Sequence, residues 1–170
     1  MLGVEEALER VLQVVHVLEG EERPIVDALG QVLTEDVSAG FDVPAMDNSA
    51  MDGYAVQAAS LKGASRGAPR VLPVVQSVAA GDVPRGAVPL GKAVRIMTGA
   101  TVPQGADAVV PFEDTDESER TDGGGAPAQV AVYNEVTPGE NVRPAGQDIE
   151  KGRRVMARGT TLRAPDIGVL

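Results

Sequence analysis

The chain has 170 residues, of which 43% are apolar, and its net charge of −10 argues against general nucleic-acid binding, which usually needs a basic surface. It has no cysteine and a single histidine, His16, which excludes disulfides, thiolate chemistry and zinc sites built from cysteine or several histidines. No run of about 18 apolar residues is present and the N-terminus lacks a signal pattern, so we expect a cytoplasmic protein without a membrane span.

Residues 4–18 have the pattern of an amphipathic helix. Apolar side chains recur there at steps of three and four residues, and polar side chains, His16 among them, fall on another face. Gly20 can end this helix. We expect a short helical turn near 24–29 and an extended segment at 31–37 to follow.

Beyond this region the helical period disappears as far as about residue 144, and short valine-rich runs take its place. Turn sequences that contain glycine or proline separate these runs. The runs cover residues 71–75, 93–97, 106–112 and 128–136. We expect a flexible hairpin tip at 122–125, a last extended segment at 153–161 and a helix or linker at 164–170. The pattern predicts a mainly β fold of the α+β class, with a barrel-like or sandwich-like module after an N-terminal helix.

Residues 44–56 concentrate acid, amide, hydroxyl and phenol groups. Three of these side chains readily hydrogen-bond nearby backbone, namely Asp47, Asn48 and Ser49. Gly53 adds a turn position that tolerates a positive φ. We expect Met46 and Met51 to anchor the segment in apolar surroundings, which would make it a rigid loop with fixed carboxylates. The alternative is a solvated turn.

Charge is distributed unevenly along the chain. Acidic side chains are concentrated at residues 1–40 and 111–122, whereas basic side chains dominate residues 143–163. The basic segment can attract a phosphorylated ligand or an acidic partner surface, or it can form a solvated face.

Three polar residues stand out for their chemistry. Asp52 and Asp148 each lie in a glycine-containing turn, and Mg²⁺ is usually held by one or two carboxylates together with waters and substrate phosphates. Thr98 follows an apolar strand, where a hydroxyl and exposed backbone N–H groups can bind an oxyanion. Each of these features, taken alone, is also compatible with an ordinary turn.

Three motifs carry a resemblance to a known family. They are residues 47–55 (DNSAMDGYA), residues 95–100 (RIMTGA) continuing to 103–110 (PQGADAVV), and residues 141–149 (NVRPAGQDI). In this order they resemble the signatures of the molybdopterin molybdenumtransferase family, which comprises the bacterial MoeA proteins and the E domain of gephyrin. The resemblance runs from about residue 4 to residue 170 and implies a MoeA N-terminal-region-like fold.

The resemblance also implies a domain organisation. Residues 1–42 and 145–170 would form one discontinuous domain, and residues 43–144 an inserted β domain. The family's usual length continues into an α/β domain that binds the pterin and a small β domain, neither of which lies in these 170 residues. Because the family's active cleft forms between this β module of one subunit and the pterin-binding domain of another, the chain would carry about half a site.

Proteins of this family insert molybdate into adenylylated molybdopterin with the help of Mg²⁺ and release AMP. The resemblance therefore implies adenylylated molybdopterin and molybdate as substrates, Mg²⁺ as cofactor, a homodimer, and molybdopterin adenylyltransferase as the upstream partner. It implies no nucleic acid or membrane as partner. These 170 residues alone would be inactive. The alternatives are a stand-alone, non-catalytic binding or dimerisation module and a scaffold module like that of gephyrin.

Roles for single residues follow from the same motifs. Asp52 and Asp148 would hold Mg²⁺ and orient the phosphate linkage, and Thr98 would lie in the cleft near the substrate. Three further residues would shape the site or contact the ligand, namely Asn48, Ser49 and Arg143. Gln147 stands where the family usually has glutamate, which leaves the metal role in this motif to Asp148.

Overall fold

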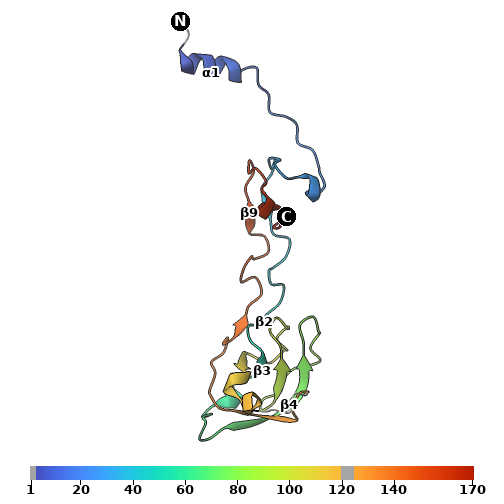
Figure 1. The fold of residues 1–170 in the computed structure, drawn as a ribbon, viewed down its shortest axis with the longest axis vertical. Coiled ribbons are helices and arrows are strands. Elements are labelled where there is room, and N and C mark those ends of the chain that lie inside the picture. The colour runs from blue at the N-terminus through green and yellow to red at the C-terminus, as the bar shows by residue number, and fades with distance from the viewer. Residues whose placement is uncertain (1–2, 120–124) are drawn as a thin grey trace. The chain divides into compact units, whose positions relative to one another are not determined.

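The computed structural model describes residues 3–119 and 125–170 (Figure 1). The chain divides into two compact units, one built from the residues up to 38 together with 154–170, and one from residues 39–153. The domain boundaries that the resemblance implies, at 42/43 and 144/145, stay a prediction. The expected hairpin tip lies outside the described residues except for Gly125. No helix in the described part of the chain is long and apolar enough to cross a membrane.

The first unit contains two short helices, a 3₁₀ turn and a pair of short strands. Its elements are α1 (Val4–Leu12), η1 (Ile25–Asp27), β1 (Val37–Ser38), β9 (Arg154–Met156) and α2 (Ala164–Ile167). Strands β1 and β9 pair antiparallel. The turn near 24–29 is confirmed, and residues 164–170 begin as a helix. The late extended segment is confirmed only at Arg154–Met156, because a turn follows in which the Thr160 N–H donates to Ala157 O.

Helix α1 is shorter than its sequence pattern predicts. The expectation of a helix up to residue 18 is wrong, because the helix ends at Leu12. No residue of α1 is buried, and Val17 and Leu18 are 97% and 90% exposed. Most helices in proteins are stabilised by packing of their apolar face rather than by propensity. No described residue buries the apolar stripe of this helix, so packing does not stabilise its continuation beyond Leu12.

Asp36 fastens two parts of the first unit to each other. Its Oδ1 accepts a hydrogen bond from the backbone N–H of Arg158 at 2.7 Å, and its Oδ2 pairs with Arg154 Nη1 at 3.1 Å. The hydrogen bond from the Arg158 N–H, followed by the one from Arg154, lowers the pKa of Asp36 below its ordinary value. Arg154, a member of the basic segment, is thus already paired.

Acid is expected to loosen this unit through Asp36. Because its folded-state pKa lies below the ordinary value of 3.8, the stabilisation by its carboxylate is complete above that value and is lost as the pH falls through the folded-state pKa. Asp36→Asn cannot titrate and should lose less stability between about pH 6 and about pH 2. Thermal unfolding followed at the Arg158 amide by NMR measures this difference. Equal losses in the variant and the unchanged chain would contradict it.

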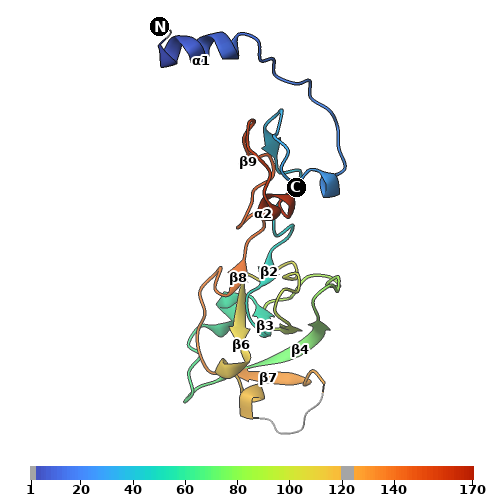
Figure 2. The same ribbon diagram turned by 45° about the horizontal axis from the view of Figure 1, so that its top comes forward.

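The second unit is built around a five-stranded sheet in the order β6-β3-β5-β4-β7. Its strands are β3 (Gly53–Val56), β4 (Arg70–Val78), β5 (Ala93–Ile96), β6 (Ala108–Pro111) and β7 (Gln129–Val132). The first half of β4 pairs antiparallel with β7, and its second half pairs parallel with β5. This change of partner curls the sheet into a half-barrel (Figure 2). The predicted mainly β fold with an N-terminal helix is confirmed.

The inner part of the sheet is buried on both faces, whereas β4 alternates between buried and exposed residues. Strand β3 is buried along its whole length, so that Tyr54 and Val56 enter one apolar cluster and Ala55 enters another. Valine supplies much of both clusters, as expected for a chain with 2% aromatic residues. Three 3₁₀ turns complete the unit, namely η2 (Ala58–Leu61), η3 (Phe112–Asp114) and η4 (Asp116–Glu119).

The polar segment at 44–56 differs from the expected loop. Its last part is the buried inner strand β3, and Asn48–Ser49 form the short strand β2. Met46 and Met51 are 62% and 38% exposed, so the expectation that they anchor the segment in apolar surroundings is wrong. Backbone hydrogen bonds to other strands hold the segment instead, as in any sheet.

Candidate functional site

Asp52 and Thr98 are in direct contact. The backbone N–H and the hydroxyl of Thr98 both donate to Asp52 Oδ1, each at 2.7 Å. Pairing of Gly53 with Ile96 in β3 and β5 brings the two residues together at neighbouring strand ends. The backbone hydrogen bond from Thr98, followed by its hydroxyl and by the charge of Arg95, lowers the pKa of Asp52. An exposed, ionised carboxylate is therefore fixed at this edge of the sheet.

The turn after β5 does not offer free backbone donors. The N–H of Thr98 is bonded to Asp52, that of Gly99 donates to Ser49 O at 2.8 Å, and that of Ala100 donates to Met97 O at 3.0 Å. These N–H groups are therefore engaged within the protein, which agrees with the alternative of an ordinary strand-ending turn. The same groups join the first motif to the second.

Asn48 and Arg143 face each other across a short ladder. Strand β2 pairs antiparallel with β8 (Val142–Arg143), which sets Asn48 opposite Arg143 (Figure 2). The N–H of Ser49 also donates to Ala100 O at 3.0 Å. The structure therefore brings parts of the three motifs side by side in the second unit, although the sequence separates them widely.

Ser49 shapes this region from within. The residue is fully buried, its hydroxyl donates to Met51 O at 2.5 Å, and it accepts from the Met51 N–H at 3.3 Å. A side chain without exposed surface fits a shaping role rather than contact with a ligand. Asn48 is partly exposed and Arg143 is exposed.

Asn141 is a structural residue that sequence reasoning missed. It adopts a φ of 57°, which asparagine tolerates better than most residues. Its Nδ2 donates to Val109 O at 2.9 Å, and its carbonyl accepts from the Ala50 N–H at 2.9 Å. The residue thereby fixes the start of the third motif against the sheet. The sequence offers only a weak signal for this role, namely that asparagine tolerates a positive φ better than most residues.

Asp148 lies beside Val43, which precedes the first motif in the chain. It makes no hydrogen-bond contact with Asp52 among the described residues. Its backbone N–H donates to Val43 O at 2.9 Å, and its side chain is exposed. No hydrogen bond links Asp148 with Asp52, and residues 3–119 and 125–170 contain no group of three His, Cys, Asp or Glu placed to hold a metal. A carboxylate is an ordinary ligand for Mg²⁺, which keeps several waters and binds substrate phosphates, but no contact among the described residues brings these two carboxylates together.

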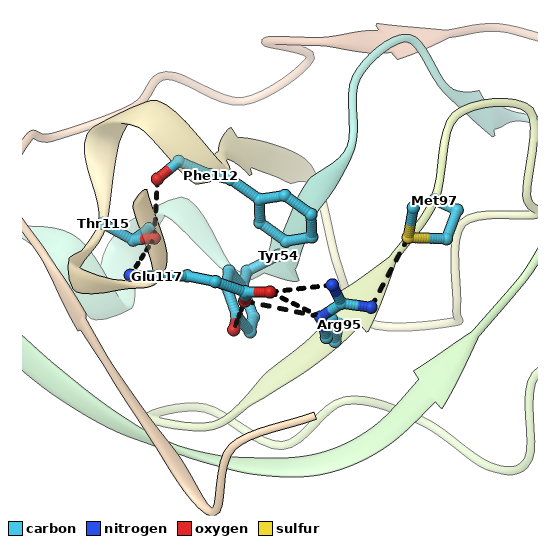
Figure 3. Close-up of polar contacts among 6 residues, drawn as sticks. All are labelled: Tyr54, Arg95, Met97, Phe112, Thr115 and Glu117. Atoms are coloured by element: carbon cyan, nitrogen blue, oxygen red, sulfur yellow. Dashed lines mark hydrogen bonds and ion pairs between the residues drawn. The ribbon is translucent and has the colours of Figure 1, made fainter. Parts of the chain in front are cut away.

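A second polar cluster surrounds Arg95, three residues before Thr98 in the chain (Figure 3). Arg95 Nη2 and Nε donate to Glu117 Oε1 at 2.7 and 3.0 Å, and the Tyr54 hydroxyl donates to Glu117 Oε2. The Arg95 guanidinium also lies over the Phe112 ring, 4.6 Å from its centroid. The side chains of Arg95 and Glu117 are only 21% and 17% exposed. Sequence reasoning missed this pair because Glu117 stands in a run of acids that resembles a solvated segment.

An apolar hollow of about 850 Å³ lies in the first unit. Residues that line it include Val17, Leu18, Val32 and Leu162. None of the candidate site residues contributes to it, so its apolar lining does not bear on their chemistry.

Comparison with known proteins gives consistent matches. The model of a family described as the MoeA N-terminal region (domain I and II) matches residues 2–170. The chain is 40% identical over 146 residues to molybdopterin molybdenumtransferase 2 of Mycobacterium tuberculosis, covering 86% of this chain and 34% of that protein. It is 36% identical over 159 residues to the molybdopterin molybdenumtransferase of Bacillus subtilis, covering 94% and 36%.

Solved structures give the same result. The chain resembles a molybdopterin biosynthesis MoeA protein from Pyrococcus horikosii with a TM-score of 0.84 and 35% identity, covering 100% of this chain and 42% of that one. The chain spans about a third of the length of the curated relatives named above.

Proposed function

The chain belongs to the MoeA N-terminal region family, and we propose that it is the part of a molybdopterin molybdenumtransferase that supplies acidic and hydroxyl groups for molybdate insertion. The observation that carries this proposal is the contact between Asp52 and Thr98, which comes from the first two motifs. Pairing of Asn48 with Arg143 adds the third motif to the same region. The names of the relatives, molybdopterin molybdenumtransferases, support a role in the transfer of molybdenum to molybdopterin.

The proposed chemistry assigns a different task to each group. Thr98 saturates Oδ1 of Asp52 and so fixes the carboxylate, while Oδ2 accepts no hydrogen bond from the described residues. Asp52 Oδ2 and the Asp148 carboxylate would hold Mg²⁺, which when bound neutralises charge on the phosphate linkage of adenylylated molybdopterin. Arg143 forms no ion pair with the described residues, and its guanidinium suits a phosphate or molybdate oxygen.

The proposed site is incomplete in this chain alone. Ligand pockets usually bury about 70% or more of a ligand, whereas Asp52, Thr98 and Arg143 are all exposed. A pterin-binding domain of a second subunit would close the cleft, so the working enzyme would be a homodimer in the cytoplasm. A molybdopterin adenylyltransferase would deliver its substrate.

One observation favours a second candidate function. The apolar stripe of α1 is unburied, with Val4, Leu8 and Val11 at 81%, 57% and 58% exposure. A stripe of this kind suits association with another surface. A stand-alone binding, dimerisation or scaffold module would use this stripe without turnover.

The isolated chain is expected to fold but not to release AMP from adenylylated molybdopterin in the presence of molybdate and Mg²⁺. Addition of the part of the Bacillus subtilis relative that this chain does not match should restore some release, because it supplies the missing half of the cleft. That part alone serves as the control. Turnover by the isolated chain would contradict the divided site, and self-association without any turnover in the mixture would favour the second function.

A further inference from the structure

We propose that the Arg95–Glu117 pair is a positioning device for the contact between Asp52 and Thr98. This role matters for catalysis only if the proposed function holds, but the contacts that support it are present in the structure in either case. Apart from the effect of the Arg95 charge on the pKa of Asp52, the pair has no role in the site described above. Its guanidinium contacts Met97 and Phe112 (Figure 3). Met97 precedes Thr98 in the chain, and the Phe112 N–H donates to the carbonyl of Asp52.

The first connection leads to Thr98. Arg95 Nη1 donates to the sulfur of Met97 at 3.6 Å, and Met97 immediately precedes Thr98. The Met97 N–H donates to Val78 O at 3.1 Å, so both the backbone and the side chain of this residue are held. The guanidinium therefore constrains the path of the chain after β5, and with it the position of Thr98.

The second connection leads to Asp52. The Arg95 guanidinium lies 4.6 Å from the centroid of the Phe112 ring, a distance at which cation–π attraction is favourable. The backbone N–H of Phe112 in turn donates to the carbonyl of Asp52 at 3.1 Å. Arg95 also stands opposite Tyr54 in the ladder, which makes Asp52 its diagonal neighbour on the adjacent strand.

Glu117 fixes the guanidinium in this place. Its carboxylate accepts from Arg95 and from Tyr54, and its backbone N–H donates to the hydroxyl of the buried Thr115 at 3.2 Å. The Thr115 hydroxyl itself donates to Phe112 O at 2.8 Å. Such a network has charge-assisted hydrogen bonds at its centre and little exposed surface, which favours one fixed arrangement over a mobile surface pair.

The amide proton of Thr98 reports on this arrangement without any substrate. Its bond to Asp52 is short, and an amide proton in a short hydrogen bond resonates downfield. Arg95→Gln should shift this resonance upfield, because Met97 and Phe112 lose their contacts with the guanidinium and the bond from Thr98 to Asp52 lengthens. Glu117→Gln should shift it in the same direction by less, since the amide oxygen still accepts a hydrogen bond. In the double variant the second substitution should add nothing.

Arg70→Gln is the matched control. Arg70 lies in β4 and donates to Lys62 O through Nε and Nη2 at 3.1 and 2.7 Å, so its loss removes comparable hydrogen bonds elsewhere in the unit. It should leave the Thr98 resonance in place. A Thr98 resonance unchanged in Arg95→Gln, or shifted as much by Arg70→Gln, would overturn the inference. If Arg95→Gln does not fold, an unchanged resonance in Glu117→Gln overturns it. None of these outcomes bears on molybdate insertion, so the proposed function is tested separately.

Discussion

Replacement of Gly53 by alanine is expected to unfold the second unit. A Cβ at this position would lie 1.9 Å from Val110 O, 2.8 Å from Val110 C and 3.0 Å from Pro111 Cα. All three are backbone atoms of the neighbouring strand, which cannot move aside without separating β3 from β6. Substitutions that cost more than about 4 kcal/mol are exceptional, and a clash of this kind in the centre of the sheet belongs among them.

Chemical denaturation of Gly53→Ala measures this loss. Gly67→Ala is the control, because a Cβ there meets no atom within 4 Å and its φ lies outside the left-handed region. We expect the control to unfold within about 1 kcal/mol of the unchanged chain. A folded Gly53→Ala protein of similar stability would show that the close approach of β3 to β6 is described incorrectly.

The glycine illustrates what the sequence could predict. A glycine after Asp52 indicated a turn with positive φ, but Gly53 is needed because another strand passes close to it. Valine-rich runs predicted the strands because β-branched side chains suit a buried pleated surface. The close approach of β3 to β6 at Gly53 depends on how the two strands are aligned. The residues around Gly53 alone do not specify that alignment.

The N-terminal helix shows where a clear sequence pattern predicts too much structure. Its period of 3.6 residues extends to residue 18, yet the helix ends at Leu12. A hydrophobic period predicts a helix on the assumption that the apolar stripe is buried. In the described residues that stripe is exposed, so the pattern identifies the type of element correctly but overestimates its length.

The candidate site was predictable only in part. Asp52 and Thr98 were both found from their motifs, whereas their contact joins residues 46 positions apart and follows from the pairing of β3 with β5. Arg95 and Glu117 were not found at all. Arg95 is one charged residue in a strand and Glu117 is one acid in an acidic run. Their pairing can be recognised only in the folded structure.

Asp52→Asn is expected to abolish most molybdate insertion while leaving the fold intact. The amide oxygen can replace Oδ1 and still accept from Thr98, so the strand ends remain joined. The charge that would hold Mg²⁺ is lost, however, and removal of one electrostatic group from an active site typically costs about 100-fold or more in rate. Asp107→Asn is the matched control, because Asp107 Oδ1 likewise accepts a backbone N–H, that of Ala58, at 2.6 Å.

The most direct test is AMP release by a fusion in which this chain replaces the matching 36% of the Bacillus subtilis molybdopterin molybdenumtransferase. The fusion should release AMP from adenylylated molybdopterin when molybdate and Mg²⁺ are present. Its Asp107→Asn form should match it, and its Asp52→Asn form should be slower by about 100-fold or more at an unchanged melting temperature. A folded Asp52→Asn fusion as active as the control would contradict the account.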